Sequence, residues 1–201
     1  VAAAGHHHVT MLQWPWVERE AERLLKEQLL SKPTMIRVRG RRRMGKTSTV
    51  KRALDGLKLP FIFFTIVPDE KGLVDAFVGA LEAIGKDPFI IAGLQRAQSI
   101  ITEVGKKYPL SMVGSAYMVA AYAYELVVRG AVIVFDEIQN LVNMPSFSEA
   151  LKQTIDSLRE SKNTGTIIML GSNPLLEDDV FGFQAPLMGR SNACIDIGPF
   201  V

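Results

Sequence analysis

The chain has 201 residues, of which 48% are hydrophobic, and this is enough for one globular domain with a full core but leaves little room for two. Lys and Arg total 23 against 21 acidic residues, so the net charge of +2 does not by itself predict a nucleic-acid partner. The single cysteine, Cys194, excludes an internal disulfide framework and fits a reducing, cytoplasmic setting.

Residues 1–10 are expected to form a tag-like or disordered N-terminus, followed by one domain over 11–201. The first nine residues read VAAAGHHHV, without the basic start and long apolar run of a signal peptide. The His6–His8 triplet is compatible with a metal site, a tag remnant or a disordered tail. Adjacent terminal histidines rarely form a defined metal site, so we expect none here.

The first elements follow from hydrophobic periodicity. Apolar residues recur at helical spacing over 17–30, and Pro33 ends this helix. Met35–Arg39 (MIRVR) alternates apolar and basic residues and predicts a short strand. A helical pattern over 50–57 comes next. The run at 61–67 (FIFFTIV) predicts a second strand that is apolar on both faces, as in a covered parallel sheet.

Helical and extended patterns then alternate to the end of the chain. Strands interleaved with helices predict an α/β fold with a parallel sheet that carries helices on both faces. The three further strands are expected at Ala131–Phe135, Thr166–Leu170 and Ala193–Ile197, and the helical patterns lie at 73–84, 90–104, 116–128 and 147–158.

Residues 40–47 match the phosphate-loop pattern G-x-x-x-x-G-K-[ST], between a predicted strand and a predicted helix. The glycines permit a tight turn whose N–H groups point at phosphate oxygens, and the following helix adds the positive end of its dipole. A lysine there reaches the β- and γ-phosphates and a threonine hydroxyl binds Mg²⁺. Nucleotide-binding residues are therefore expected at Gly40, Arg41, Arg42, Arg43, Met44, Gly45, Lys46, Thr47 and Ser48.

Five arginines surround this loop, at Arg37, Arg39 and Arg41–Arg43. One interpretation is a nucleic-acid patch. The other, which we favour from the sequence, is that loop arginines face solvent or pair with nearby acids.

The strand expected at 131–135 ends in Asp136 and Glu137. Because successive strand residues point to opposite faces, the two carboxylates leave the strand tip in different directions. Asp136 is then expected to bind Mg²⁺ together with Thr47, and Glu137 to orient and polarise the attacking water. The chain has no N-K-x-D motif, and a glutamate placed to activate water favours ATP hydrolysis over GTP hydrolysis or small-molecule phosphorylation.

Ser172 and Asn173 follow the fourth predicted strand. They are candidates for contacts with the γ-phosphate and the attacking water. The alternative is a capped turn before Pro174, because Ser and Asn are ordinary turn residues.

The segment 111–128 is apolar over almost a transmembrane length, but it contains Glu125. It also lies between Lys46 and Asp136, which a membrane span would separate. We therefore interpret it as a buried helix and expect no membrane partner.

These motifs resemble the archaeal-type AAA+ ATPases, which are related to the STAND signalling ATPases. The resemblance runs from about residue 16 to the end. It is carried by GRRRMGKT at 40–47, FDEIQ at 135–139, LGSN at 170–173, APLMGR at 185–190 and the Val17–Glu22 segment.

The resemblance implies a three-layer P-loop NTPase of the AAA+ (ASCE-like) type with sheet order 5-1-4-3-2, and a conformational cycle driven by ATP, ADP and Mg²⁺. It places Arg19 beside the nucleotide base. It also offers Arg190 as an arginine finger acting in trans within a homo-oligomer, although an arginine there is equally suited to a structural ion pair.

Family members continue past the fifth strand into a helical lid and a partner domain, whereas this sequence stops at Val201. We therefore expect an ATPase core without its lid. DNA or protein partners would be contacted through the region that is missing. Two other hypotheses stay open: a nucleotide-gated binding module with little turnover, and an ATPase of DNA transactions assisted by the loop arginines.

Overall fold

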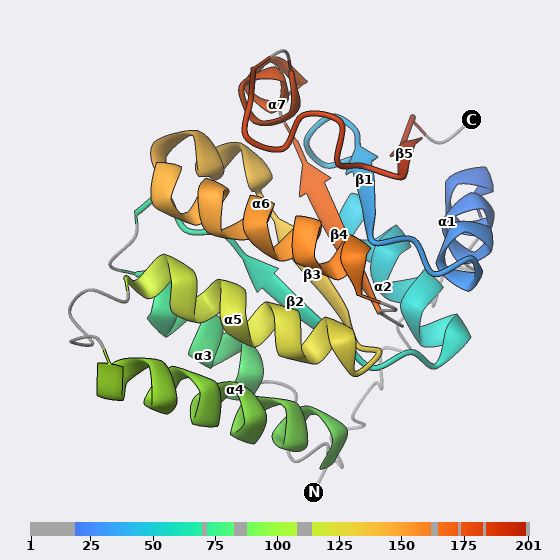
Figure 1. Cartoon of the computed structure of the whole chain (residues 1–201). Coiled ribbons are helices and arrows are strands. Elements are labelled where there is room, and N and C mark those ends of the chain that lie inside the picture. Colours follow the sequence, from blue (N-terminus) through green and yellow to red (C-terminus); the bar gives the residue numbers. More distant parts are fainter. Residues whose placement is uncertain are drawn as a thin grey trace, which may run out of the picture.

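The computed structural model describes residues 19–69, 72–82, 88–107, 114–161, 165–172, 174–182 and 184–199. Its centre is a five-stranded sheet with the order β2-β3-β4-β1-β5, and all four neighbouring pairs are parallel (Figure 1). This is the predicted order 5-1-4-3-2 counted from the other edge. The strands are β1 (Met35–Arg39), β2 (Phe61–Thr65), β3 (Val132–Asp136), β4 (Thr166–Gly171) and β5 (Ala193–Asp196).

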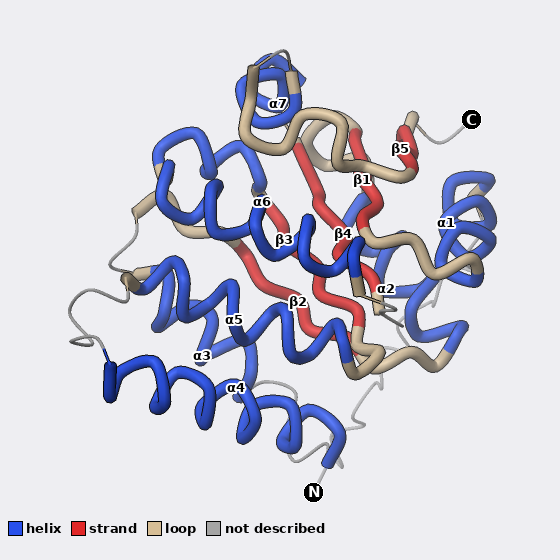
Figure 2. The backbone as a smooth tube through the Cα atoms, in the orientation of Figure 1, coloured by secondary structure: helices blue, strands red, loops and turns tan. Residues whose placement is uncertain are grey.

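Helices connect the strands and cover both faces of the sheet (Figure 2). The predicted helices are confirmed with shifted ends, but two elements after β3 and β4 were not predicted: the 3₁₀ helix η2 and the helix α7. Pro174 misled the sequence interpretation, because proline fits the first turn of a helix as well as a turn. The helices are α1 (Glu20–Leu30), α2 (Lys46–Leu57), α3 (Leu73–Glu82), α4 (Pro88–Lys107), α5 (Ser115–Val128), η2 (Ile138–Asn143), α6 (Pro145–Glu160) and α7 (Pro174–Phe181).

Alternation along each strand divides the core into two clusters, one on each face of the sheet. In β3, Val132 and Val134 pack toward α1 and α2, whereas Ile133 and Phe135 pack toward α3, α5 and α6. A strand turns successive side chains to opposite faces, so an apolar run buries both. The result is a three-layer α/β structure.

The helix α5 covers residues 115–128 of the apolar segment 111–128. Its fully buried residues, which include Ala116, Val119, Ala123 and Leu126, share one face, and α3, α4 and α6 pack around the helix. This explains why it lacks a polar face. None of the helices in the described part of the chain combines the length and apolarity that a membrane crossing needs.

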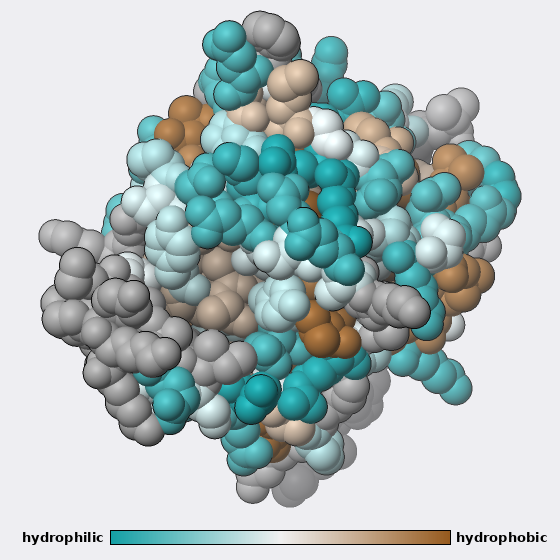
Figure 3. Space-filling model, in the orientation of Figure 1, coloured by the Kyte–Doolittle hydropathy of each residue, from teal (hydrophilic) through white to brown (hydrophobic). Residues whose placement is uncertain are grey.

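The surface in the same orientation is mainly hydrophilic, and its apolar residues lie in several separate small areas (Figure 3). Singly exposed apolar residues are normal on a folded domain. This face therefore does not indicate a large docking surface.

Candidate functional site

The site begins where β1 ends and the chain turns into α2. Gly45 precedes α2 with φ of 81°, in the left-handed region that favours glycine. A Cβ on Gly40 would stand 2.6 Å from the carbonyl oxygen of Ile197, so only glycine fits there. The N–H of Ile197 donates to the carbonyl of Arg39 at 2.7 Å. The chain leaving β5 is thus packed against the first residue of the loop.

The Lys46 side chain is only 7% exposed and lies across the loop. Its amine donates to the carbonyl oxygens of Gly40 at 2.7 Å and of Arg41 at 3.0 Å. These contacts keep a positive charge beside the backbone N–H groups at the start of α2. An ammonium and a helix N-terminus together favour a phosphate group.

Thr47 and Asp136 meet across the site from two distant parts of the chain. Asp136 continues the alternation of Val132 and Val134, so its side chain points to the α2 face, where the Thr47 hydroxyl donates to its Oδ2 at 3.1 Å. Its Oδ1 accepts the N–H of Glu137 at 2.8 Å.

Burial raises the pKa of Asp136 above its ordinary value, although the hydrogen bonds from the Glu137 N–H and the Thr47 hydroxyl act in the opposite direction. A half-buried carboxylate beside a hydroxyl is a donor set that suits Mg²⁺, which prefers oxygen ligands and keeps several waters. Within the described ranges no group of three or more His, Cys, Asp or Glu side chains could hold a metal ion. Thr47 and Asp136 are the residues whose oxygen atoms could hold Mg²⁺ beside the phosphate loop.

Glu137 is held in place by its backbone and by two side chains. It has φ of 58°, in the left-handed region that is unusual for a residue with a Cβ. Its Oε2 accepts hydrogen bonds from the Ser172 hydroxyl at 2.8 Å and from the Gln139 side-chain amide. The same amide donates to the Ser172 Oγ at 3.1 Å. Asn140 anchors η2 by donating to the carbonyl of Ile66 at 2.7 Å.

Gln139 is a site residue that sequence reasoning did not select. In the sequence it is the last residue of the FDEIQ segment at 135–139. The available signal was its spacing, because a residue two positions after Glu137 at the start of a turn can fold back onto that carboxylate. Ser172, which was selected, does reach Glu137, whereas Asn173 lies outside the described residues.

Arg19, which the resemblance places beside the nucleotide base, contacts the phosphate loop. Its Nη1 donates to the carbonyl of Met44 at 2.6 Å, and its guanidinium lies 3.5–3.7 Å from the Cβ position of Gly45. The neighbouring Glu22 is buried and forms an ion pair with Lys26 at 2.9 Å. The contacts of Arg19 attach the start of α1 to the phosphate loop. Ser48 is exposed in the first turn of α2.

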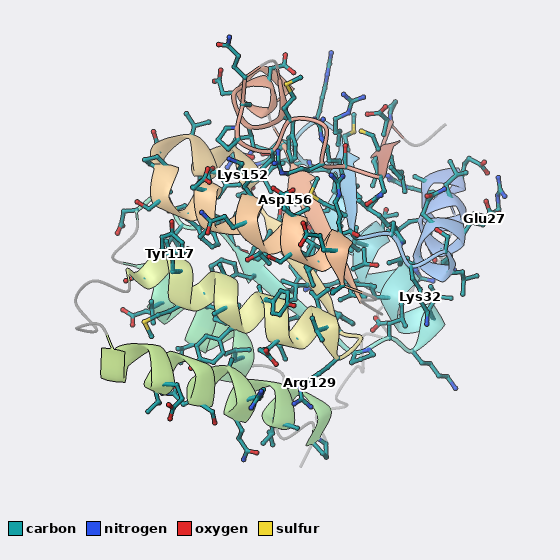
Figure 4. All side chains as sticks on the ribbon, viewed as in Figure 1. Glu27, Lys32, Tyr117, Arg129, Lys152 and Asp156 are labelled. Carbon is teal, nitrogen blue, oxygen red and sulfur yellow. The ribbon has the colours of Figure 1, made fainter. Side chains whose placement is uncertain are left out.

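Arg190 is not brought to this site within the chain. Two residues later, the Asn192 side chain accepts the N–H of Met35 at the start of β1, so Arg190 lies near the amino edge of the sheet. The loop follows the other end of β1, about 13 Å away at ~3.3 Å per residue. Arg190 forms two hydrogen bonds with Asp156 of α6, at 2.9 and 2.7 Å, and Asp156 is labelled in Figure 4. Chiefly through the Arg190 hydrogen bond, the pKa of Asp156 is lowered.

The five arginines near the loop fall into two groups. Arg37 lies over the ring of Phe181 at 3.9 Å, and Arg39 forms two hydrogen bonds with Asp196, at 2.8 and 2.9 Å. The three consecutive arginines 41–43 are exposed. Arg39 is thus paired with an acid, Arg37 with an aromatic ring, and the three loop arginines are exposed.

No protein-family model matches the chain, and no curated protein matches it either. Among solved structures it is similar to the ORC2 protein of Aeropyrum pernix, solved as ADPNP and ADP complexes. The two share 14% identity with a TM-score of 0.57, and the match covers 92% of this chain and 48% of that chain.

A second similar structure is the HORMA:CdnC:Trip13 complex of E. coli MS115-1, at 11% identity and a TM-score of 0.47, covering 88% of this chain and 52% of the other. A TM-score below 0.5 does not define a fold, so only ORC2 bears on the architecture. The chain has an AAA+-like fold and spans about half the length of the ORC2 chain, at 48%.

Proposed function

We propose that this chain is the core of a Mg²⁺-dependent ATPase that hydrolyses the acid anhydride of ATP to drive a conformational switch. One observation carries the proposal. The Lys46 amine crosses the phosphate loop, and the Thr47 hydroxyl beside it donates to Asp136, which comes from the tip of β3. An amine, a hydroxyl and a carboxylate from two distant segments therefore converge at the carboxyl edge of a parallel sheet, where this fold class binds ligands.

The proposed roles follow from this geometry. Backbone N–H groups of residues 40–47 and the Lys46 amine bind the phosphates, and Arg19 fixes the loop from the side of α1. Thr47 and Asp136 would hold Mg²⁺, which supplies positive charge against the phosphate oxygens when bound. Glu137 orients water and accepts its proton, and Ser172 and Gln139 position the Glu137 carboxylate.

A second candidate function is a nucleotide-gated binding module with little turnover. The observation that favours it is the pairing of the Glu137 carboxylate with Ser172 and Gln139, because an Oε2 atom that already accepts two hydrogen bonds is less available to a water molecule.

Lys46→Ala and Glu137→Gln separate the two functions. If the chain is an ATPase, Glu137→Gln lowers kcat about 100-fold or more while ATP binding persists, and Lys46→Ala loses both. Phosphate release and binding of a fluorescent ATP analogue measure these effects. The matched controls are Glu160→Gln and Lys32→Ala, which change exposed charges far from the loop. A wild type that binds ATP but hydrolyses it no faster than Glu137→Gln is a binding module instead.

The proposal includes action of Arg190 on a neighbouring subunit. Because Arg190 lies near the opposite edge of the sheet from Lys46, it can serve a phosphate only of another copy. Mixing Arg190→Ala with Lys46→Ala subunits tests this: restored hydrolysis in the mixture supports action in trans. Unchanged activity of Arg190→Ala alone, with a lowered melting temperature, assigns the residue to its ion pair with Asp156.

A further inference from the structure

Three consecutive arginines form the crest of the phosphate loop. Within the described residues, no acidic side chain forms an ion pair with Arg41, Arg42 or Arg43, and all three are exposed. Four of the other nine arginines form ion pairs with acids within the described residues. The paired residues are Arg23, Arg39, Arg52 and Arg190.

The role of the loop in binding a nucleotide does not use these side chains. A phosphate loop cradles its ligand with backbone N–H groups and one lysine. The guanidinium groups at 41–43 instead project into solvent from the outer side of the turn. Unpaired guanidinium groups beside one another repel, and a ligand with several negative charges would relieve this repulsion.

A cavity of about 640 Å³ continues this basic surface on the other side of the loop, under α7. Arg37, Arg39, Arg41 and Asp178 are among the residues that line it. Arg37 and Arg39 point there because they alternate with Ile36 and Val38, which face α2. Phe181 holds the Arg37 guanidinium in a fixed place by stacking against it.

We propose that the crest arginines and this cavity together bind the phosphodiester backbone of a single-stranded nucleic acid. Arg41 belongs to both parts, so the basic surface is continuous from the crest to Arg37. Asp196 is neutralised by Arg39, which leaves the surface with an excess of positive charge. Phe181 is only 8% exposed and cannot stack on a base, so the contact is to phosphates and is independent of base sequence.

The proposal is independent of the ATPase proposal, and its test omits nucleotide and Mg²⁺. Fluorescence anisotropy of a labelled oligo-dT at 50–200 mM salt gives the affinity and its salt dependence. Neutralising about three phosphates predicts a log–log slope of about −2 for a single strand. In Arg41→Gln/Arg42→Gln the affinity falls about tenfold at the lowest salt, and the slope decreases by about 1.4.

The matched control removes the same charge at the amino edge of the sheet. Lys32 and Lys58 are exposed and precede β1 and β2, so Lys32→Gln/Lys58→Gln keeps the affinity within about twofold. Equal losses in the two double variants would show only a general effect of net charge and would overturn the proposal. Absence of binding by the wild type at 50 mM salt would overturn it as well.

Three further measurements fix the location and the ligand class. Asp178→Asn removes a negative charge from the cavity wall and is expected to tighten binding about twofold. Lys46→Ala is expected to keep it, and a loss above tenfold would place the phosphates in the nucleotide site and overturn the proposal. Polyglutamate that competes as well as oligo-dT at equal charge would assign the surface to an acidic protein and also overturn it.

Discussion

Two aspartates near opposite edges of the same sheet have pKa shifts in opposite directions. Near the amino edge, Arg190 lowers the pKa of Asp156, and the pair closes the segment before β5 onto α6. At the carboxyl edge, burial raises the pKa of Asp136 next to the phosphate loop. The Arg190–Asp156 pair uses charge to stabilise the fold, as the Arg39–Asp196 pair does at the carboxyl ends of β1 and β5. The carboxyl edge keeps a desolvated carboxylate whose charge is only partly balanced, which is typical of a functional site.

Gly40 and Gly189, which lie near opposite edges, differ in the room around them. At the carboxyl edge Glu137 is held in the left-handed region, and Gly40 is in a contact that no other residue could make. Near the amino edge Gly189 also has positive φ, but a Cβ there would have nothing within 4 Å. Gly165, just before β4, is also packed too closely for a side chain, because a Cβ there would clash with the Ala131 carbonyl oxygen. At the phosphate loop the close packing occurs together with the unusual backbone of Glu137.

The largest expected effect is the difference between two glycine-to-alanine substitutions, Gly40→Ala at the carboxyl edge and Gly189→Ala near the amino edge. In Gly40→Ala the new Cβ would clash with the Ile197 carbonyl and displace the loop, so ATP affinity should fall about 100-fold, and the protein should lose about 2–3 kcal/mol of stability. Gly189→Ala has room and suffers only backbone strain of about 1 kcal/mol. Calorimetry of ATP binding and thermal melts measure the pair. Equal loss of affinity in both variants would contradict the comparison.

A smaller effect, on kcat, is expected when Glu137 loses one of the hydrogen bonds that hold its side chain. Gln139→Ala removes a hydrogen-bond donor to Glu137, so we expect kcat to fall about tenfold with little change in ATP affinity. Gln153→Ala, on the exposed face of α6, is the matched control and should leave both unchanged. A rise in kcat would show instead that Gln139 restrains a base that works better without it.

Replacement of each of the two aspartates by asparagine should change the melting temperature in opposite directions. Asp156→Asn breaks a pair with a mostly buried guanidinium and should cost about 1 kcal/mol, which lowers the melting temperature by about 2–4 °C. Asp136→Asn removes a desolvated charge, so it should raise the melting temperature slightly while it weakens Mg²⁺-dependent binding of ATP. Scanning calorimetry of the two variants and the wild type shows whether each melting temperature rises or falls.

The smallest effect is the pH dependence of these differences. The folded pKa of Asp156 is lowered, so its stabilisation is complete above the unfolded value of about 3.9 and is lost as the pH falls through the folded pKa. The folded pKa of Asp136 is raised, so its contribution decreases as the pH rises from about 4 through the folded pKa. Denaturant titrations between pH 3 and pH 7 should show the Asp156→Asn deficit vanish at low pH.

The fold was predictable because its signals are local. The apolar runs at β3 and β4 and the phosphate loop after β1 fix the class of sheet, and the resemblance supplied the strand order. The helix α7 was missed because its eight residues (PLLEDDVF) offer too few turns for a periodicity, and Pro174 is compatible with two structures.

The site was predictable only in part. Lys46, Thr47 and Asp136 lie in motifs whose chemistry dictates their place. The partners of Glu137 and Arg190 were not determined by the motifs, because Gln139 reaches Glu137 only through the turn of η2 and Asp156 reaches Arg190 through a tertiary contact. Their distances depend on how η2 and α6 pack, and periodicity does not specify this.

The contact between Gly40 and Ile197 has a mechanical consequence. Since the Ile197 N–H is bonded to the Arg39 carbonyl and its own oxygen lies against Gly40, a shift of the phosphate loop cannot occur without moving residues 197–199. The position of the segment after β5 is therefore coupled to the conformation of the phosphate loop. A ligand that shifts the loop would shift this segment, and a displacement of the segment would change the affinity of the loop for its ligand.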